Sequence, residues 1–138
     1  MKIEFQPQPP SQEQFHALFE TTGWNLDYQA APEELAQAVA NSQFVVAAYA
    51  GEQLVGFGRV VTDGVLHAMI YDMIVAPAFQ GQGIGTQILR MLIHWCNETH
   101  IRDIQLFCAR GKRTFYENNG FAVRPDDAPG MQYTRHRR

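Results

Sequence analysis

Three glycines stand within five positions, at Gly81, Gly83 and Gly85, where an apolar run ends and a helix-like run begins. A glycine-rich turn that leads into a helix leaves backbone N–H groups unpaired at the positive end of the helix dipole. A side chain in that turn would keep a phosphate away from the amides, and the turn itself favours positive φ. The pattern predicts an anion site, to which the hydroxyl of Thr86 can contribute. A tight strand-to-helix turn without a ligand is the structural alternative.

These glycines match neither of the common nucleotide-binding patterns. A dinucleotide fingerprint that starts at Gly81 needs glycine where Thr86 stands, and one that starts at Gly83 needs it where Ile88 stands. A Walker loop fails as well, because the Gly-Lys pair of this chain is followed by arginine instead of serine or threonine. The sequence therefore argues against nucleoside triphosphate binding.

The elements that must position this turn follow from the spacing of apolar residues. Alternating runs predict strands, helical spacing predicts helices, and Gly51-Glu52 predicts the turn of a hairpin. Ser11 is placed to cap the first helix. In chain order we expect a strand at 2–6, helices at 12–22 and 32–42, strands at 44–50, 53–63 and 65–76, a helix at 83–98, a strand at 104–109, a helix at 112–119, and strands at 121–125 and 131–135.

This order predicts the α/β (α+β) class, with a mixed, largely antiparallel twisted sheet of about seven strands and about four flanking helices. A chain of 138 residues fits a single domain over residues 1–138 with a sizeable core.

Composition narrows the classes of function. The chain is 46% hydrophobic, and no apolar run approaches the ~20 residues of a membrane span, so we expect no membrane partner. The first residues lack the apolar core of a secretory signal, which favours a cytoplasmic location. A formal net charge of −3 argues against nucleic acid. Cys96 and Cys108 form no CxxC motif, so we expect buried free thiols.

Two motifs resemble one known family. The stretch QGQGIG at residues 80–85 resembles the Q/R-x-x-G-x-G/A acetyl-CoA signature of the GNAT superfamily of N-acetyltransferases. The stretch FYENNGF at residues 115–121 resembles the F-Y-x-x-x-G-F segment of the same family, one strand and one helix later. The expected order of elements is also similar to the GNAT fold, and the N-terminal third matches least.

The resemblance implies where coenzyme A lies. Its pyrophosphate is expected on the amides after the strand at 65–76, and its pantetheine arm is expected to pair with the end of that strand. Gln80 replaces the arginine that is frequent in the family, which removes a charge but keeps the amide. The implied cofactor-binding residues are Met73, Ile74, Val75, Gln80, Gly81, Gln82, Gly83, Ile84, Gly85 and Thr86. No metal is expected, because the thioester donor requires none and the sequence lacks a zinc spacing.

Acetyl transfer from a thioester to an amine needs a deprotonated amine, a donor for the oxyanion and a proton for the leaving thiolate. A backbone N–H near Ile74 is the oxyanion donor that the family geometry implies. The family motif places the proton donor at Tyr116, whose phenol is protonated at neutral pH. The alternative is that Tyr116 only packs.

Asp72 is the candidate base. With strict alternation it shares a face with Ile70 and Ile74, and a carboxylate among isoleucines is costly unless it is paired or used. Three alternatives remain open: a pairing with an arginine such as Arg59, hydrogen bonds to backbone at a bulge, and deprotonation through a chain of waters.

The acceptor is expected at the N-terminal third, where Trp24 and Tyr28 fall on a loop between the first two helices, together with Tyr71 from the strand at 65–76. Capping of the core is the alternative for these rings. The sequence thus predicts an acetyl-CoA-dependent N-acetyltransferase that acts on the primary amine of a small molecule by direct transfer in a ternary complex. The alternatives are a protein lysine or N-terminal acetyltransferase and a non-catalytic sensor of coenzyme A. The family also makes a homodimer a reasonable expectation.

Overall fold

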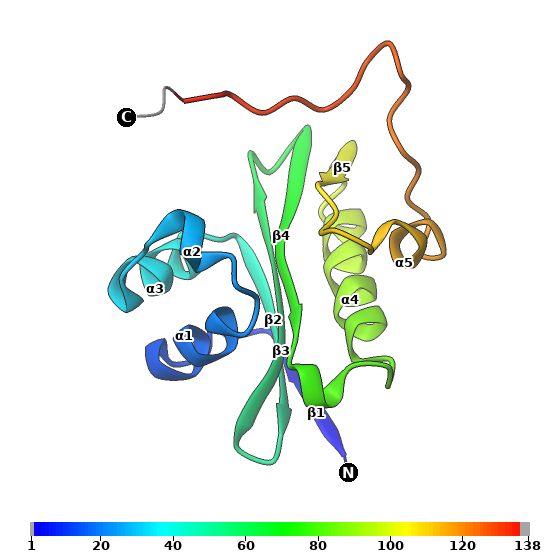
Figure 1. Cartoon of the computed structure of the whole chain (residues 1–138). Coiled ribbons are helices and arrows are strands. Elements are labelled where there is room, and N and C mark those ends of the chain that lie inside the picture. Colours follow the sequence, from blue (N-terminus) through cyan, green and yellow to red (C-terminus); the bar gives the residue numbers. More distant parts are fainter. Residues whose placement is uncertain (1, 136–138) are drawn as a thin grey trace. The chain divides into compact units, whose positions relative to one another are not determined.

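A computed structural model describes residues 2–135, which form two compact units (Figure 1). The first unit ends at Leu106 and the second begins at Phe107. A single domain over residues 1–138 stays a prediction. In the described part of the chain, no helix is long and apolar enough to cross a membrane.

The first unit is built on a five-stranded sheet, in which neighbours in sequence are also neighbours in space. The first four strands are antiparallel, and the last runs parallel to its neighbour. The strands are β1 (Ile3–Gln6), β2 (Phe44–Ala50), β3 (Gln53–Thr62), β4 (His67–Val75) and β5 (Asp103–Leu106). The sheet is therefore mixed and largely antiparallel, as predicted.

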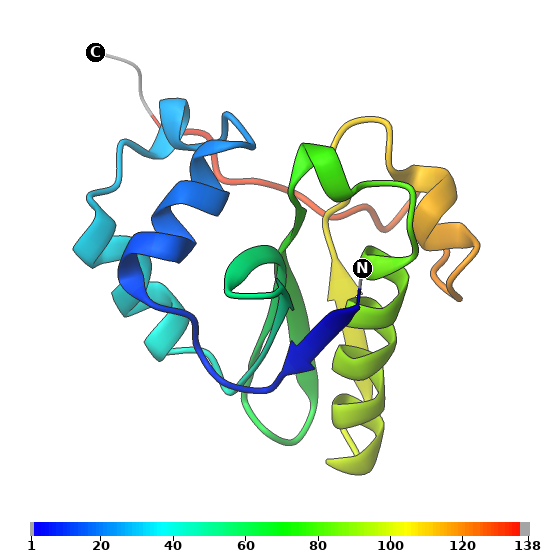
Figure 2. The ribbon, with the colours of Figure 1, turned by 90° about the horizontal axis from the view of Figure 1, so that it is seen from below.

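Helices cover both faces of this sheet. The helices α1 (Gln12–Glu20), α2 (Asn25–Tyr28) and α3 (Pro32–Ala40) lie on one face, and α4 (Ile84–Glu98) lies on the other (Figures 1 and 2). A short 3-10 helix, η1 (Pro77–Phe79), follows β4 and leads into residues 80–86, which we call the glycine turn. The predicted cap is confirmed, since the Ser11 side chain accepts a hydrogen bond from the Gln14 N–H at 3.2 Å.

The two faces enclose apolar cores because both surfaces of the sheet are lined with small and branched residues. On the α4 face, Ile88, Leu89 and Leu92 are fully buried. On the other face, Phe15 of α1 packs edge-on against Phe57 of β3, with ring centroids 4.7 Å apart.

Two glycines of β3 set the distance between α4 and the sheet. A Cβ at Gly58 would lie 2.8 Å from Met73 Sδ and 2.9 Å from atoms of Ile88 and Leu92. A Cβ at Gly56 would lie 2.9 Å from Ile88 and 3.1 Å from Ile84, the first residue of α4. The absence of side chains at these two positions therefore lets α4 approach the sheet closely.

The strict alternation predicted for β4 is wrong at Asp72. Phe57 pairs with Ile74 and Arg59 pairs with Tyr71, so two residues of β4 oppose Gly58 alone. This is a β-bulge, and Asp72 adopts a positive φ of 56° in it. Alternation could not reveal the bulge, because an extra residue shifts the phase of a strand without changing its composition.

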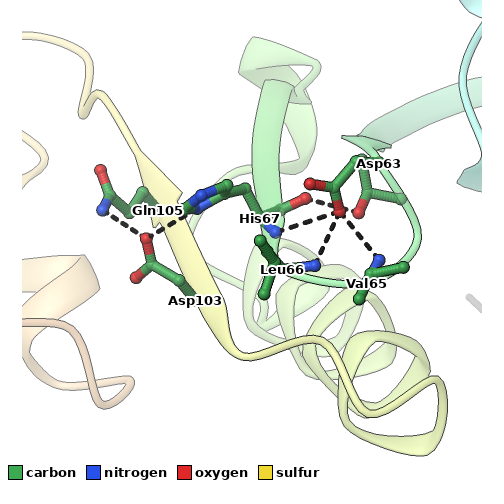
Figure 3. Close-up of polar contacts among 7 residues, drawn as sticks. Asp63, Val65, Leu66, His67, Asp103 and Gln105 are labelled. Atoms are coloured by element: carbon green, nitrogen blue, oxygen red, sulfur yellow. Dashed lines mark hydrogen bonds and ion pairs between the residues drawn. The ribbon is translucent and has the colours of Figure 1, made fainter.

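The turn from β3 to β4 is organised by Asp63, at the opposite end of β4 from the glycine turn. Its Oδ1 accepts hydrogen bonds from the N–H groups of Val65 and Leu66, both at 2.8 Å, and of His67 at 3.2 Å (Figure 3). Next to this turn, Asp103 of β5 approaches His67 Nδ1 at 3.4 Å and accepts a hydrogen bond from Gln105. The bonds from Val65 and Leu66 hold the pKa of the Asp63 carboxyl below its usual value.

The second unit contains the predicted short helix, α5 (Arg113–Glu117). The predicted strands at 121–125 and 131–135 are wrong, since residues 121–135 carry no strand. A strand needs a partner for its ladder, and alternation alone supplies none. Instead, the N–H of Ala128 donates a hydrogen bond to the carbonyl oxygen of Pro125 at 2.9 Å and closes a turn. The backbone of Gly130 lies close to the ring of Phe107. The sheet therefore has five strands, not about seven.

Candidate functional site

A row of unpaired amides lies at the start of α4. The N–H groups of residues 81–86 have no protein acceptor within the described chain. Gly81 and Gly83 have φ of 79° and 84°, which a residue with a Cβ rarely adopts, and a Cβ built at either glycine meets no atom within 4 Å. Gly83 is also the N-cap of α4 and offers no capping side chain. The positive end of a fifteen-residue helix is therefore open to an anion, as the sequence predicts.

Every residue from Gln80 to Thr86 takes part in this turn, although their side chains differ in exposure. Ile84 is buried against the sheet and anchors the first turn of α4. Gly85 and Thr86 are partly buried, and Gln82 is exposed. Gln80 Nε2 donates a hydrogen bond to the carbonyl oxygen of Val75 at 3.0 Å, which ties the glycine turn to the last residue of β4.

The end of β4 has a free edge. The strand β5 pairs with β4 only from His67 to Ile70, so the last five residues of β4 face no strand on that side in the described sheet. The N–H of Ala76 donates a hydrogen bond to the carbonyl oxygen of Val55 on β3 at 2.8 Å. After the bulge, the backbone N–H and C=O groups of even-numbered residues therefore point to β3. Met73 and Val75 therefore turn their backbone groups to the free edge. The predicted oxyanion donor is a backbone N–H near Ile74, and the N–H groups that are free there are those of Met73 and Val75.

Asp72 is held by an arginine. Arg59 Nε lies 2.7 Å from Asp72 Oδ2, and both side chains are more than four-fifths buried. Arg59 Nη1 also donates to the carbonyl oxygen of Ala38 at 3.3 Å and to Ser42 Oγ at 3.2 Å. The second carboxylate oxygen, Oδ1, has no protein partner in residues 2–135. The pairing with Arg59 is one of the alternatives that the sequence leaves open, and the use of Asp72 as a base stays a prediction.

The three aromatic residues predicted at the acceptor site differ in their surroundings. Trp24 is half-buried and packs edge-on against Phe19, with ring centroids 6.0 Å apart, so it caps the core. Tyr28 is 71% exposed. The segment that carries both residues, predicted as a loop between the first two helices, forms the short helix α2, with Trp24 as its N-cap. Tyr71 is exposed, and the Arg59 guanidinium lies 5.4 Å from its ring centroid, so a cation already occupies one face.

Tyr116 lies in the second unit. It is buried between Phe115 and Phe121, with ring centroids 5.0 and 5.9 Å away. Burial, together with the smaller effect of the nearby Cys108, raises the pKa of Tyr116 to about 12. The phenol therefore keeps its proton throughout the neutral range. The expectation that both thiols are buried is half right, since Cys96 is buried and Cys108 is exposed.

Sequence reasoning missed one contribution to this site and offered another only as an alternative. The first is the pair Gly56 and Gly58, which bring the start of α4 against β3. Their Gly-x-Gly spacing inside a strand was a readable signal, because glycine in a strand often marks a close approach. The second is the bulge at Asp72, which the sequence offered as one of three alternatives for that aspartate.

The matches to known proteins agree with this geometry. Residues 40–123 match the model of the acetyltransferase (GNAT) domain. The chain belongs to the GNAT family. In this GNAT chain, the match includes the hairpin, β4, the glycine turn and α4, together with Tyr116.

Curated relatives are identical to this chain at about a third of the aligned positions. It is 34% identical over 98 residues to the uncharacterised N-acetyltransferase ycf52 of Pyropia yezoensis, covering 68% of this chain and 56% of the relative. It is 30% identical to the histone acetyltransferase TAP1 of Glycine max, covering 83% and 53%. It is 31% identical to the chloroplastic serotonin N-acetyltransferase 2 of Oryza sativa, covering 76% and 54%. The chain thus spans about half the length of these curated relatives.

Solved structures share the fold. A GNAT family acetyltransferase from Streptococcus pneumoniae has a TM-score of 0.80 and 26% identity, covering 99% of this chain and all of that one. The PaiA N-acetyltransferase of Thermoplasma acidophilum, solved in complex with coenzyme A, has a TM-score of 0.70 and 21% identity, covering 90% and 92%. The second likeness shows the fold alone.

Proposed function

We propose that this GNAT chain is an acetyl-CoA-dependent N-acetyltransferase that transfers an acetyl group to the primary amine of a small molecule. The observation that carries the proposal is the row of unpaired amides at residues 81–86, which Gln80 ties to the free edge of β4. In this donor site, the amides of residues 81–86 bind an anion. The free edge of β4 offers the hydrogen bonds that a neighbouring strand would use. Coenzyme A is a ligand that has both a pyrophosphate and an amide-containing arm.

The residues present fit this donor. The open space at Gly81 and Gly83 leaves the amides accessible to a pyrophosphate, and no acidic side chain lies in the first turn of α4. The backbone groups of Met73 and the N–H of Val75 are free to pair with the pantetheine arm, whereas the Val75 carbonyl accepts the hydrogen bond from Gln80. Acetyl-CoA supplies the activated acetyl group as a thioester, and the proposal requires no metal.

The proposed chemistry is a direct transfer. The amine nitrogen attacks the thioester carbonyl, the C–N bond forms, and the C–S bond breaks. The oxyanion is stabilised by a free amide at the edge of β4, from Met73 or Val75. Tyr116 is the proposed proton donor to the leaving thiolate, and its raised pKa keeps it in the protonated form that this role requires. Asp72 Oδ1, or water, is the proposed acceptor of the amine proton.

Two classes of acceptor are considered, a small-molecule amine and a protein lysine. The name of the Oryza sativa relative supports a small aromatic amine, and the name of the Glycine max relative supports a protein lysine. Tyr28 is the exposed ring available to an aromatic or cationic acceptor. We favour the small molecule and keep the protein lysine as the alternative. The cytoplasmic location and the homodimer remain predictions.

Donor binding is tested by the thermal unfolding midpoint of the full chain with and without coenzyme A. A ligand at one hundred times its Kd stabilises the folded state by about 2.7 kcal/mol. Gly83→Val should abolish the shift, because the side chain covers the amides. Gly64→Val is the matched control, since Gly64 has a similar φ of 82° and open space but lies in the turn held by Asp63. The donor site would be refuted if the wild-type chain showed no shift with millimolar ligand.

Turnover is tested by thiol release from acetyl-CoA with a panel of acceptors. The panel contains serotonin, a polyamine and a lysine-rich histone peptide. Release with a small amine and none with the peptide supports the favoured acceptor, and the reverse supports protein acetylation. Coenzyme A binding without release for any acceptor would favour a sensor.

A further inference from the structure

Arg59 joins three parts of the first unit that the sequence separates. It lies opposite Tyr71 in the β3–β4 ladder, the last regular pair before the bulge. Its guanidinium contacts the Asp72 carboxylate, the last turn of α3 at Ala38 and the Ser42 hydroxyl. The pair with Asp72 is largely buried, so water competes weakly for either charge.

The bulge at Asp72 reverses which backbone groups of β4 face β3. Before the bulge, the N–H of Asp63 donates to the carbonyl oxygen of His67 at 3.3 Å, so the backbone N–H and C=O groups of odd-numbered β4 residues point to β3. After the bulge, the hydrogen bond from Ala76 to Val55 shows that the backbone groups of even-numbered residues point to β3. Without the extra residue, Met73 and Val75 would turn toward β3 and lose their free groups.

The bulge has a conformational cost that Asp72 bears. A φ of 56° is unfavourable for any residue with a Cβ, although aspartate tolerates it better than most. Ion pairing of the Asp72 carboxylate fixes that residue in place and offsets this cost. The bond from Arg59 to Ala38 holds the guanidinium against α3, so the arginine itself is well positioned.

We propose that Arg59 is a positioning residue that, through Asp72, holds the β4 bulge and so presents the backbone of Met73 and Val75 to the acetyl-CoA arm. The inference rests on the proposed function, because that proposal supplies coenzyme A as the ligand. The geometry rests on the bulge, which turns the backbone of Met73 and Val75 to the free edge. Arg59 does not touch the reacting atoms in this role. The role is distinct from proton transfer by Asp72, because it acts on the affinity for coenzyme A as well as on the amide that stabilises the oxyanion.

The test compares two substitutions that differ by one methyl group, with the Kd for coenzyme A measured by calorimetry on the full chain. Asp72→Ala removes the carboxylate and keeps the conformational cost, so the Kd should rise about tenfold, equivalent to about 1.4 kcal/mol. Asp72→Gly removes both the carboxylate and the cost, so the Kd should rise much less. A base role alone predicts equal losses of kcat for the two variants and an unchanged Kd, which would overturn the proposal.

Arg59 itself is tested in both backgrounds. Arg59→Gln should raise the Kd about tenfold in the native background and have little further effect in Asp72→Gly, where no strain is left to offset. Arg59→Lys should restore part of the affinity, since lysine can pair with Asp72 but cannot also reach both Ala38 and Ser42 in the same fork. Arg102→Gln is the control, because Arg102 is exposed and donates only to the carbonyl of Val65. Equal Kd values for wild type, Arg59→Gln and Asp72→Ala would overturn the proposal.

A second measurement does not depend on coenzyme A. In the wild-type chain, the amides of Met73 and Val75 should exchange with solvent faster than that of Ile74. In Asp72→Ala, loss of the bulge should reverse this order, whereas Asp72→Gly should keep it. An unchanged order in Asp72→Ala would overturn the inference even if donor binding is confirmed. A wild-type chain that shows the exchange pattern but binds no coenzyme A would refute the proposed function and leave the positioning role supported.

Discussion

Burial keeps the phenolic proton of Tyr116 in place well into the alkaline range. The side chain is enclosed by Phe115 and Phe121, and its pKa is raised to about 12. Because the folded-state pKa lies above the ordinary value of about 10, folding favours the neutral phenol. The resulting stability is fully present below pH about 10 and is lost as the pH rises through about 12.

Tyr116→Phe should therefore weaken the alkaline loss of stability between pH about 10 and about 12, as measured by denaturant unfolding at each pH. The loss should not disappear, because burial also raises the pKa of Tyr49 and Cys96. If Tyr116 is the proton donor, the same change should lower kcat about 100-fold, a typical contribution of a general acid. The control is Tyr133→Phe, at a tyrosine that is 79% exposed. Unchanged turnover in Tyr116→Phe would end the donor role.

Asp63 gives the opposite pH dependence at the turn before β4. The N–H groups of Val65, Leu66 and His67 stabilise its carboxylate, so the folded-state pKa lies below the ordinary value. Its contribution to stability is present above pH about 4 and is lost as the pH falls through the lowered pKa.

Asp63→Ala should lower the denaturant midpoint at neutral pH, and Asp63→Asn should lower it less, because an amide oxygen can still accept the hydrogen bonds. Both variants should lose less stability than the wild type as the pH falls from about 4 through the lowered pKa of Asp63. Coenzyme A affinity should not change, since the turn lies at the far end of β4 from the glycine turn. An unchanged midpoint in Asp63→Ala would show that these hydrogen bonds do not stabilise the turn.

At the scale of elements, the close approach of α4 to β3 decides where the helix terminus lies. Alanine in place of a strand glycine ordinarily gains about 0.5–1 kcal/mol. At Gly58, however, the new Cβ would lie 2.8 Å from Met73 Sδ and 2.9 Å from Leu92 Cδ1. Overpacking of this kind costs about 1–3 kcal/mol, so the packing penalty exceeds the gain.

Gly58→Ala should therefore destabilise the fold by about 1–3 kcal/mol in equilibrium denaturation. Combined with Leu92→Ala, which removes one of the clashing atoms, it should cost less than the sum of the two single changes. A stabilising effect of Gly58→Ala would mean that α4 is free to move away from the sheet.

Elements with a local signal could be predicted from the sequence, and elements that depend on a partner could not. Ser11 marked the start of α1, and the glycine turn marked the start of α4. The helix α2 was missed because four residues are too few to show a period. The strands predicted at 121–125 and 131–135 failed because alternation cannot show whether a neighbouring strand exists. The bulge at Asp72 could be offered only as one alternative for a similar reason, since its evidence is the register of β4 against β3.

The candidate site was predicted unevenly for the same reason. The amides at residues 81–86 follow from glycine and helix geometry, which are local. Asp72 could be named, but its partner could be offered only as one of several alternatives, because Arg59 lies thirteen positions away and on another strand. The roles of Trp24 and Tyr28 depended on packing against Phe19, which no spacing of residues reveals.

Across the whole molecule, charge is divided along the chain. Residues 1–58 contain seven acidic residues and one lysine, a formal charge of −6, whereas residues 59–138 contain seven acidic and ten basic residues, a formal charge of +3. Seven of these ten basic residues follow Leu106, so the sequence up to Leu106, which holds the glycine turn, is acidic. An acidic unit suits a cationic amine as acceptor, because long-range fields raise the local concentration of the opposite charge.

The two cysteines make the chain ready for selective chemical labelling. Cys96 is buried within α4 and its pKa is raised by that burial, so a thiol-reactive dye should spare it in the folded state. Cys108 is exposed and lies in the second unit. A single maleimide probe can thus be attached to the second unit without mutagenesis. Its distance to a fluorescent coenzyme A analogue on the first unit would then become measurable by energy transfer.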